Sequence, residues 1–233
     1  MKQFCYLFFL ASLLNLTLAQ AQEKARSFVE VFGGIAGVSG NFSKNDYSNP
    51  ASGFARTGAN LGIQGAWFPG KHFGIGATIV QADYKVHTQS LAEGYLEDFD
   101  VDEATVSSKH YQLRSLLVGP YYSFTCHKFT LDLRALVGIS NTTLPALNVG
   151  LEDESSFTQN KATATSFAYQ LGAGLRYAIF SHLGLALRGD YASTKPDFSV
   201  SYTNLNNSSG RTISMYHEKI NGFNGTIGIF YQF

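Results

Sequence analysis

Eight segments of this chain alternate between apolar residues and polar or small ones, and this alternation constrains the fold more than any other feature. In the clearest segment, 165–180, the apolar set is Phe167, Tyr169, Leu171, Ala173, Leu175 and Tyr177, and the other set includes Gln170, Gly172, Gly174 and Arg176. A period of two residues belongs to a β-strand with two different faces, because successive side chains point to opposite sides. The segments lie at about 26–38, 54–68, 72–86, 109–124, 129–142, 165–180, 183–193 and 221–233. Each supplies the roughly 9–11 tilted residues that a strand needs to cross a membrane.

The connections between these segments alternate in length. Three are tight, at 69–71, 125–128 and 181–182, and four are long and polar, at 39–53, 87–108, 143–164 and 194–217. Short turns on one side and long loops on the other are typical of membrane barrels, with the short turns in the periplasm. We therefore expect an all-β fold, namely an eight-stranded antiparallel up-and-down transmembrane β-barrel.

The first residues have the composition of a secretory signal peptide. Lys2 is followed by an apolar run over 4–14 and by the small residues of Ala19-Gln20-Ala21. We expect residues 1–21 to be a cleaved leader and residues 22–233 to form the barrel domain. Cys126 is then the single remaining cysteine, so no internal disulfide is expected. The remaining 16 basic and 17 acidic residues give no reason to expect nucleic acid as a partner.

Charged residues fall on the face opposite the apolar one, so they are expected inside the barrel. They are Glu30, Arg114, Asp132, Arg134, Arg176, Arg188 and Asp190. Arg176 and Arg188 are equally distant from His182, so we expect them to be neighbours across a hairpin, with Asp132 and Asp190 as their carboxylates. We interpret this set as an ion-pair plug, because eight strands enclose only enough space for their own side chains. A polar constriction in a narrow pore is the alternative.

The sequence contains few other signs of metal binding or catalysis. Asp98, Asp100 and Asp102 begin like a calcium loop, but Glu103 stands where that loop needs glycine, so we expect a solvated acidic loop; weak divalent-cation binding is the alternative. Ser108 and His110 share one strand face, as a hydroxyl and an imidazole would in a lipid-trimming enzyme. They lack an evident orienting acid. We therefore expect no catalytic residues, no metal site and no cofactor.

The segment 226–233 carries the most specific signal. Thr226, Gly228, Tyr231 and Phe233 fit the pattern polar–x–Gly–x–x–aromatic–x–aromatic, which resembles the C-terminal signal of bacterial outer-membrane proteins. With the strand count and the loop asymmetry, the chain resembles the small outer-membrane barrels of the OmpA transmembrane-domain and OmpX type.

That resemblance implies a location in the bacterial outer membrane and assembly by the barrel-assembly machinery. It also implies contact with outer-membrane lipids and lipopolysaccharide. The expected function is a structural or surface-interaction role of the long extracellular loops, toward a ligand that the sequence does not name. A narrow, porin-like pore or transport accessory is the alternative, followed by a lipid-modifying enzyme.

Overall fold

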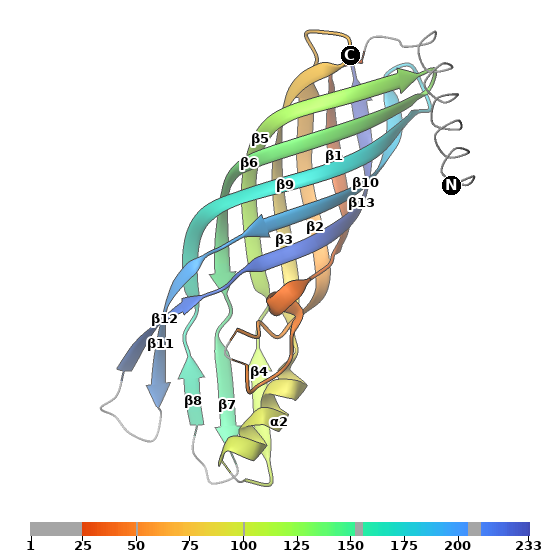
Figure 1. Cartoon of the computed structure of the whole chain (residues 1–233). Helices are drawn as coiled ribbons and strands as arrows, with labels where there is room; N and C mark the ends of the chain where they lie inside the picture. Colours follow the sequence, from red (N-terminus) through yellow and green to blue (C-terminus); the bar gives the residue numbers. More distant parts are fainter. Residues whose placement is uncertain (1–24, 50, 100, 152–155, 205–210) are drawn as a thin grey trace, which may run out of the picture.

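The computed structural model describes residues 25–49, 51–99, 101–151, 156–204 and 211–233. Its main body is a closed barrel of eight strands in the order β1-β13-β10-β9-β6-β5-β3-β2, with every neighbouring pair antiparallel (Figure 1). The barrel strands are β1 (Phe28–Ala36), β2 (Ala55–Trp67), β3 (Phe73–Val86), β5 (Tyr111–Cys126), β6 (Phe129–Leu144), β9 (Ala162–Ala178), β10 (Leu183–Thr194) and β13 (Ile220–Gln232). The fold class expected from the alternation is confirmed. The predicted leader, residues 1–21, lies outside the described residues.

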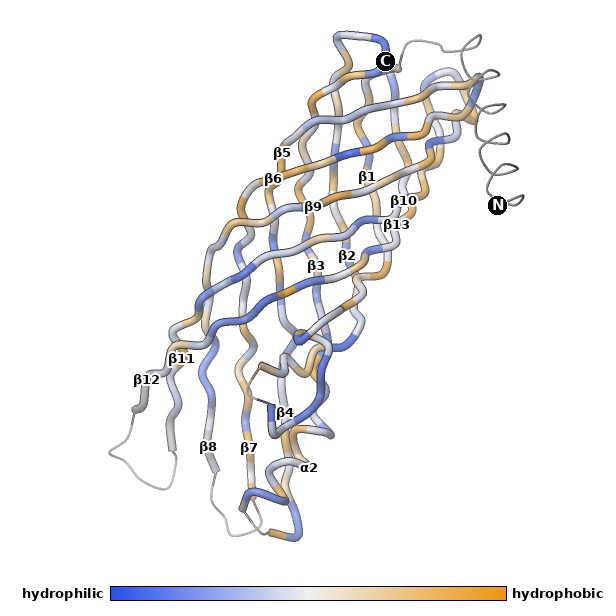
Figure 2. Tube along the Cα trace, in the orientation of Figure 1, coloured by the Kyte–Doolittle hydropathy of each residue, from blue (hydrophilic) through white to orange (hydrophobic). Residues whose placement is uncertain are grey.

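The two faces of the barrel strands differ as lipid and lumen require. On the outer face, Ile79 and Leu187 expose 55% and 64% of their surface, whereas the inward-facing Glu30 and Arg176 expose 1% each. A soluble protein has the reverse arrangement. Figure 2 shows the same alternation along the barrel strands as short changes between apolar and polar colour. The outer apolar band matches the surface that a membrane barrel presents to lipid.

The long connections are more ordered than the loops that the sequence suggested. Three of them contribute to a second, five-stranded sheet with the order β12-β11-β8-β7-β4, which lies beyond the barrel at the end opposite the C-terminus (Figure 1). Its strands are β4 (Ala104–Ser108), β7 (Leu147–Leu151), β8 (Ser156–Gln159), β11 (Asp197–Asn204) and β12 (Arg211–His217). We call this end of the molecule the loop end and the other the turn end.

Prolines mark two of the joints between the barrel and this second sheet. Pro145 separates β6 from β7, and Pro196 separates β10 from β11. Proline has no N–H to donate to a strand ladder, so each joint interrupts the barrel pairing and lets the chain change direction. The second sheet therefore continues the barrel wall after a break rather than as one uninterrupted ladder.

Two short helical segments complete the loop end. Helix α2 (Thr88–Phe99) presents Leu91 and Tyr95, four residues apart, to the buried Leu147 and Val149 of β7. The 3₁₀ segment η1 (Gly40–Ser43) belongs to the first connection and buries the side chain of Phe42. No helix in the described part of the chain has the length and apolar character needed to cross a membrane.

Candidate functional site in the barrel lumen

Three ion pairs fill the half of the lumen next to the turn end. They are Arg134–Asp190, with a nitrogen–oxygen distance of 2.5 Å, Arg176–Asp132, at 2.6 Å, and Arg188–Glu30. The six side chains are almost completely buried. A buried charge is costly unless it is paired and hydrogen-bonded, and each of these guanidinium groups contacts its carboxylate through two nitrogens.

Arg176 combines an ion pair with an aromatic contact. Its Nε donates to Asp132 Oδ2 at 2.6 Å and its Nη2 donates to Asp132 Oδ1 at 2.9 Å. The Ser123 hydroxyl donates to the same Oδ1 at 2.6 Å. The guanidinium carbon also lies 4.0 Å from the centre of the Phe28 ring, within the range of a cation–π contact. Arg176 is therefore held by Asp132 and by the Phe28 ring, while its Nη1 atom is buried without a hydrogen-bond partner among the described residues.

Two glycines leave the space that these carboxylates occupy. A Cβ atom at Gly172 would overlap Asp190 Oδ1, and a Cβ atom at Gly228 would overlap Glu30 Oε1. No side chain fits at either position without moving the ion pair. Gly228, predicted as part of an assembly signal, thus also has a packing reason to be glycine.

Aromatic rings surround the ion pairs and leave little free space around them. Phe28 lies 6.5 Å from Phe68, 6.2 Å from Tyr121 and 6.5 Å from Phe230, measured between ring centres. All four rings are buried. A hollow of about 280 Å³ opens from the turn end and reaches as far as Arg176. The ion pairs and this aromatic layer close the lumen beyond that point.

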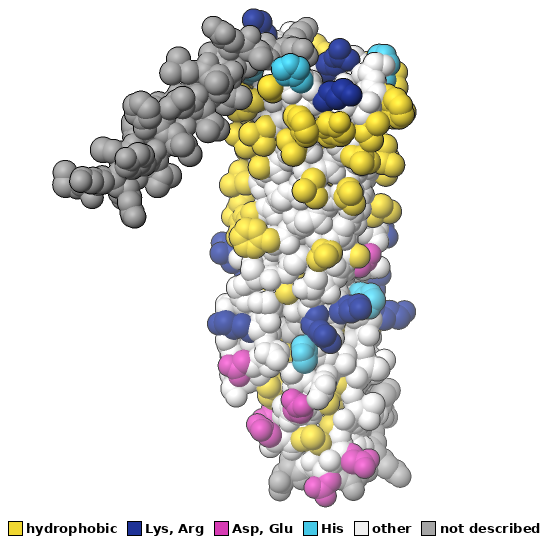
Figure 3. All heavy atoms as spheres, turned by 90° about the vertical axis from the view of Figure 1, so that its right-hand side faces the viewer, with side chains coloured by type: hydrophobic (Ala, Val, Ile, Leu, Met, Phe, Trp, Pro, Cys, Tyr) yellow, Lys and Arg dark blue, Asp and Glu magenta, His cyan; other side chains and the backbone are white. Residues whose placement is uncertain are grey.

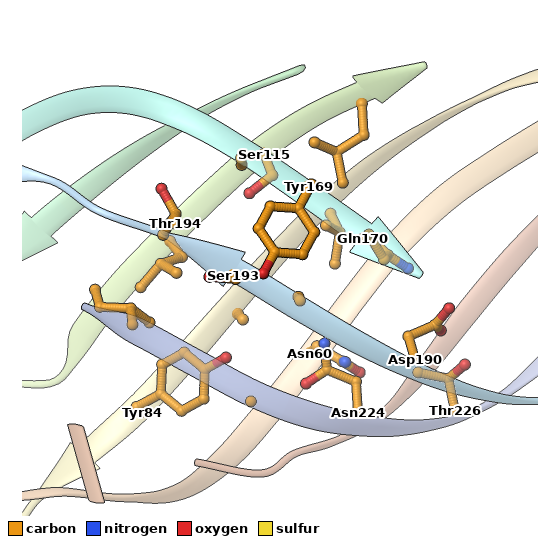
Figure 4. A pocket seen from close by; sticks show the side chains of 18 of the residues that line it. Asn60, Tyr84, Ser115, Tyr169, Gln170, Asp190, Ser193, Thr194, Asn224 and Thr226 are labelled. Carbon is orange, nitrogen blue, oxygen red and sulfur yellow. The ribbon is translucent and has the colours of Figure 1, made fainter. Parts of the chain in front are cut away.

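A small cavity lies farther along the lumen, between the ion pairs and the loop end (Figure 4). Asp190 and Thr226 line one end of it, and Tyr84 lines the other. Its volume is about 40 Å³, which is room for a water molecule or two and no more. Asn60 Oδ1 and Thr226 Oγ1 line it and have no protein partner, so the cavity is polar enough to hold water.

A second closure separates this cavity from the loop end. The Phe42 ring, which is fully buried, lies 5.4 Å from Tyr84 and 5.2 Å from Tyr111 in edge-on contacts. The Tyr111 hydroxyl donates to the carbonyl oxygen of Gly53 at 2.9 Å, which ties the first connection across the barrel opening. The lumen is thus blocked by apolar packing at one level and by ion pairs at another.

Beyond this closure, toward the loop end, a hollow of about 160 Å³ lies between the barrel opening and the second sheet. Tyr202 and Tyr216 line it, and the Tyr216 hydroxyl donates a short hydrogen bond to Glu218 Oε2. Burial raises the pKa of the Glu218 carboxyl, and the hydrogen bond from Tyr216 offsets part of that rise. Burial likewise raises the pKa of the Tyr216 hydroxyl.

Arg114 is not in the lumen, which corrects the sequence-based prediction. It is exposed on the outer face of β5, where its Nε donates to Gln81 Oε1 at 3.1 Å. The strand turns Leu113 and Leu117 inward instead, toward an apolar part of the lumen. The rule that the apolar face meets lipid fails here because the inward positions of β5 are themselves apolar.

Arg176 pairs with Asp132, one of the two carboxylates expected from the sequence, but the other pairs differ from the prediction. Asp190 pairs with Arg134, and Arg188 pairs with Glu30 of β1, the first strand in the chain. Arg176 and Arg188 are offset by one inward position, since Arg176 is opposite Ala186. Both nevertheless lie over the Phe28 ring, at 4.0 and 5.5 Å.

The residues of the predicted assembly signal point in two directions. Thr226 is buried and faces the lumen, whereas Tyr231 and Phe233 expose 49% and 63% of their surface at the turn end. Backbone bonds fix this end, with the Phe233 N–H donating to the Ser27 carbonyl oxygen at 3.0 Å.

Sequence reasoning missed several residues that complete the lumen. Gln64 accepts a hydrogen bond from Arg134 Nη1 at 2.7 Å through its Oε1 atom. Phe28 and Phe42 supply the rings described above. For Phe28 and Gln64, the alternation of their strands could have shown this, because both residues occupy positions of the inward face.

The structure also places two further motifs of the sequence. The Ser108 hydroxyl donates to the backbone carbonyl oxygens of Lys109 and Ala146, at 3.0 and 3.4 Å, rather than to an imidazole. In the acidic stretch expected as a loop, Asp98 belongs to helix α2, whereas Asp102 and Glu103 follow the helix outside regular secondary structure. Within the described ranges, no group of three or more His, Cys, Asp or Glu side chains is placed to hold a metal ion.

Residues 8–217 match the model of a protein family described as the outer membrane protein beta-barrel domain. The chain belongs to this family. The assignment agrees with the closed eight-stranded barrel and with the resemblance carried by the sequence. No curated protein sequence matches the chain significantly.

Solved structures with similar folds come from several bacteria. A major outer membrane protein from Thermus thermophilus has a TM-score of 0.52 and 12% identity, over 89% of this chain and 98% of that one. The outer membrane protease OmpT from Escherichia coli has a TM-score of 0.51 and 10% identity, over 89% and 97%. Identities this low show a shared fold and leave activity undetermined.

Proposed function

We propose that this protein is a non-conducting barrel of the bacterial outer membrane, delivered by a cleaved signal peptide, that acts through contacts made by its folded loop end outside the cell. The observation that carries this proposal is the lumen, which is closed at two separate levels by buried side chains. The ion pairs and rings around Arg176 form one closure, and Phe42 with Tyr84 and Tyr111 forms the other.

The loop end favours a surface role for a second reason. Ordering about 20 residues of a long connection has a large entropic cost, so a connection that has no task is expected to stay short and irregular. Here three connections form a five-stranded sheet, and helix α2 packs on it through Leu91 and Tyr95. Such a rigid surface suits recognition of another molecule, since less freedom is lost on binding.

A pore is the alternative function and makes the opposite prediction. The cavity of about 40 Å³ between the two closures is too small for a continuous water column, and ions would cross only if both closures moved. We propose no catalytic role, because the Ser108 hydroxyl donates to backbone oxygens.

The test is the conductance of the folded chain in a planar lipid bilayer. Folding is verified beforehand by heat-modifiable gel migration, and a porin inserted in the same bilayer shows that open barrels are detected. We expect no steady unitary current. Discrete, long-lived current steps that scale with protein concentration would overturn the proposal and make the ion pairs around Arg176 the selectivity site.

A further inference from the structure

The hollow of about 280 Å³ at the turn end is lined by basic and neutral side chains. Its basic members are Arg26, His127, Lys128 and Arg176, and neither aspartate nor glutamate is among the described residues that line it. The Arg176 side chain is buried at the inner end, whereas Arg26 and Lys128 are exposed at the mouth. A concave surface that gathers cations without carboxylates attracts anions.

Arg176 has one nitrogen left over at the inner end of this hollow. Its Nε and Nη2 atoms both donate to Asp132, and its Nη1 atom is buried with no hydrogen-bond partner among the described residues. The guanidinium group is planar, so two nitrogens that share one carboxylate leave the third on another edge, away from that carboxylate. A buried charged donor without an acceptor is costly, and an acceptor that enters through the hollow would remove this cost.

Asp132 does not supply the missing acceptor. Its Oδ1 atom accepts from Arg176 Nη2 and from the Ser123 hydroxyl, and its Oδ2 atom accepts from Arg176 Nε. Both oxygens are therefore engaged on the edge of the guanidinium group that does not carry Nη1. The acceptor for Nη1 has to come from outside this ion pair.

Hydroxyl groups lie beside Arg176 along the wall of the hollow. Thr130 of β6 is directly opposite Arg176 of β9, and its side chain is buried. The hydroxyl oxygens of Thr125 and Thr130 are 3.2 Å apart, and both residues line the hollow. When one hydroxyl donates to the other, the second keeps its hydrogen for a ligand. An oxyanion bound here meets a hydroxyl donor as well as a guanidinium nitrogen.

Backbone contacts hold the cations at the mouth of the hollow in place. The Ser181 carbonyl oxygen accepts from Arg26 Nη1 at 3.0 Å and from Gln232 Nε2 at 3.1 Å. The Lys128 carbonyl oxygen accepts from the Ala178 N–H at 2.8 Å, which fixes the turn that carries this lysine. The two cations come from distant parts of the sequence and are brought together only by the closed barrel.

The cations at the mouth have no carboxylate partner within the described ranges. The ion pairs there are the three in the lumen and His217–Asp197, and none includes Arg26, Lys128 or the terminal carboxylate of Phe233. Water can accept a hydrogen bond from Arg176 Nη1, but it carries no charge to balance Arg26 and Lys128. An anion satisfies the donor and balances the charge together.

We propose that the hollow at the turn end is a binding site for a small oxyanion, namely the phosphate or carboxylate group of a small solute. The oxyanion contacts Arg176 Nη1 and the Thr130 hydroxyl at the inner end, and Lys128 and Arg26 balance its charge at the mouth. The short turns of membrane barrels face the periplasm, so the solute enters from the periplasm. The site is separate from the loop end and does not require the lumen to open.

The test is a chemical-shift titration of the ¹⁵N-labelled, folded barrel in micelles of a non-ionic maltoside detergent, with inorganic phosphate as the probe at constant ionic strength. We expect saturable shifts of the amide signals of Thr130 and Arg176. Lys128→Gln should weaken the fitted affinity about threefold to fivefold, the usual range for an exposed charge pair. Lys71→Gln is the matched control, because Lys71 is an exposed lysine of another short turn and does not line the hollow. It should bind phosphate as the wild type does.

A second variant tests the inner end of the site. Asp132→Leu/Arg176→Met removes the whole ion pair, so no carboxylate is left unpaired. Phosphate binding should weaken by at least about tenfold, because hydrogen bonds from charged groups are among the strongest. Heat-modifiable gel migration shows whether each variant has folded. If this double variant does not fold, the comparison of Lys128→Gln with Lys71→Gln still decides the question.

Succinate as a second probe distinguishes the two sources of the oxyanion. Tighter binding of phosphate assigns the site to phosphorylated solutes, and tighter binding of succinate assigns it to carboxylates. Equal affinities of Lys128→Gln and Lys71→Gln for both probes would refute the proposal. Shifts that chloride reproduces at the same ionic strength would refute it as well.

Discussion

At the scale of single residues, the lumen contains buried ion pairs. Removing one partner of such a pair leaves the other charge buried and unpaired. Asp132 is the carboxylate for Arg176, and both are about 1% exposed. In the Asp132→Asn variant the Arg176 charge stays buried without a counterion. We expect a loss of roughly 3–5 kcal/mol in the free energy of unfolding, because breaking a buried pair leaves an uncompensated charge. Urea titration of the barrel folded into lipid vesicles measures it.

Two further variants show whether the loss arises from the unpaired charge. In Asp132→Leu/Arg176→Met both charges are gone, so most of the stability should return. Glu97→Gln changes an exposed carboxylate on α2 and should alter the free energy by no more than about 0.5 kcal/mol. An Asp132→Asn midpoint equal to that of the wild type would contradict the argument.

Residue-scale prediction from the sequence succeeded where one strand face was plainly polar. Arg176 and Arg188 face the lumen as their parity indicated. Arg114 does not, because β5 has apolar residues on both faces and parity alone cannot tell lipid from an apolar lumen. The pairing of Asp190 with Arg134 depends on which strands face each other across the barrel, and no local sequence pattern contains that information.

At the scale of elements, the joint between the second sheet and β13 contains a buried carboxyl group whose protonation affects stability. Glu218 is buried there, and its pKa is raised mainly by that burial. The folded state thus binds the proton more tightly than the unfolded state does. The resulting stability is present below the unfolded pKa of about 4.3 and is lost as the pH rises through the raised folded pKa.

The Glu218→Gln variant should remove this pH dependence. A neutral amide keeps an acceptor for the Tyr216 hydroxyl and carries no buried charge. We expect amides of β11 and β12 in the wild type to be better protected at pH 5 than at pH 7, after correction for intrinsic exchange rates, and Glu218→Gln to show little change. Hydrogen exchange measures the protection. A His217→Gln control separates the exposed pair of His217 with Asp197 from this effect.

The elements divide into those the sequence predicts well and those it does not. The barrel strands follow from their alternation, because lipid on one side and a lumen on the other impose a period of two over many residues. The strands β4, β7, β8, β11 and β12 are short, at four to eight residues each, and sit in segments rich in polar residues. Their pairing partners come from other connections, so they become strands only in the assembled sheet.

At the scale of the whole molecule, three zones follow one another along the barrel axis. From the turn end, Figure 3 shows a hydrophobic band first, then Lys, Arg and His side chains, and then acidic side chains at the tip. The acidic residues Glu93, Glu97 and Glu103 are exposed in the connection that contains α2. The apolar and basic zones draw on several strands and connections, whereas these three acidic residues belong to the one connection between β3 and β5. This order suits a barrel that crosses a membrane, because an apolar surface is stable against lipid chains and charged side chains are stable in water.

Assembly is also a property of the whole molecule, since the barrel closes only when β1 pairs with β13. Tyr231 and Phe233 project outward at this seam and contribute nothing to the lumen. Tyr231→Ala/Phe233→Ala should therefore leave the refolded barrel's stability nearly unchanged while lowering its level in the outer membrane of cells several-fold, if the assembly machinery reads these side chains. Phe73→Ala/Phe180→Ala is the matched control, because these aromatics are at least as exposed, at 68% and 69%, and lie at the same end. Equal levels of the two double variants would mean that the aromatics act only at the lipid interface.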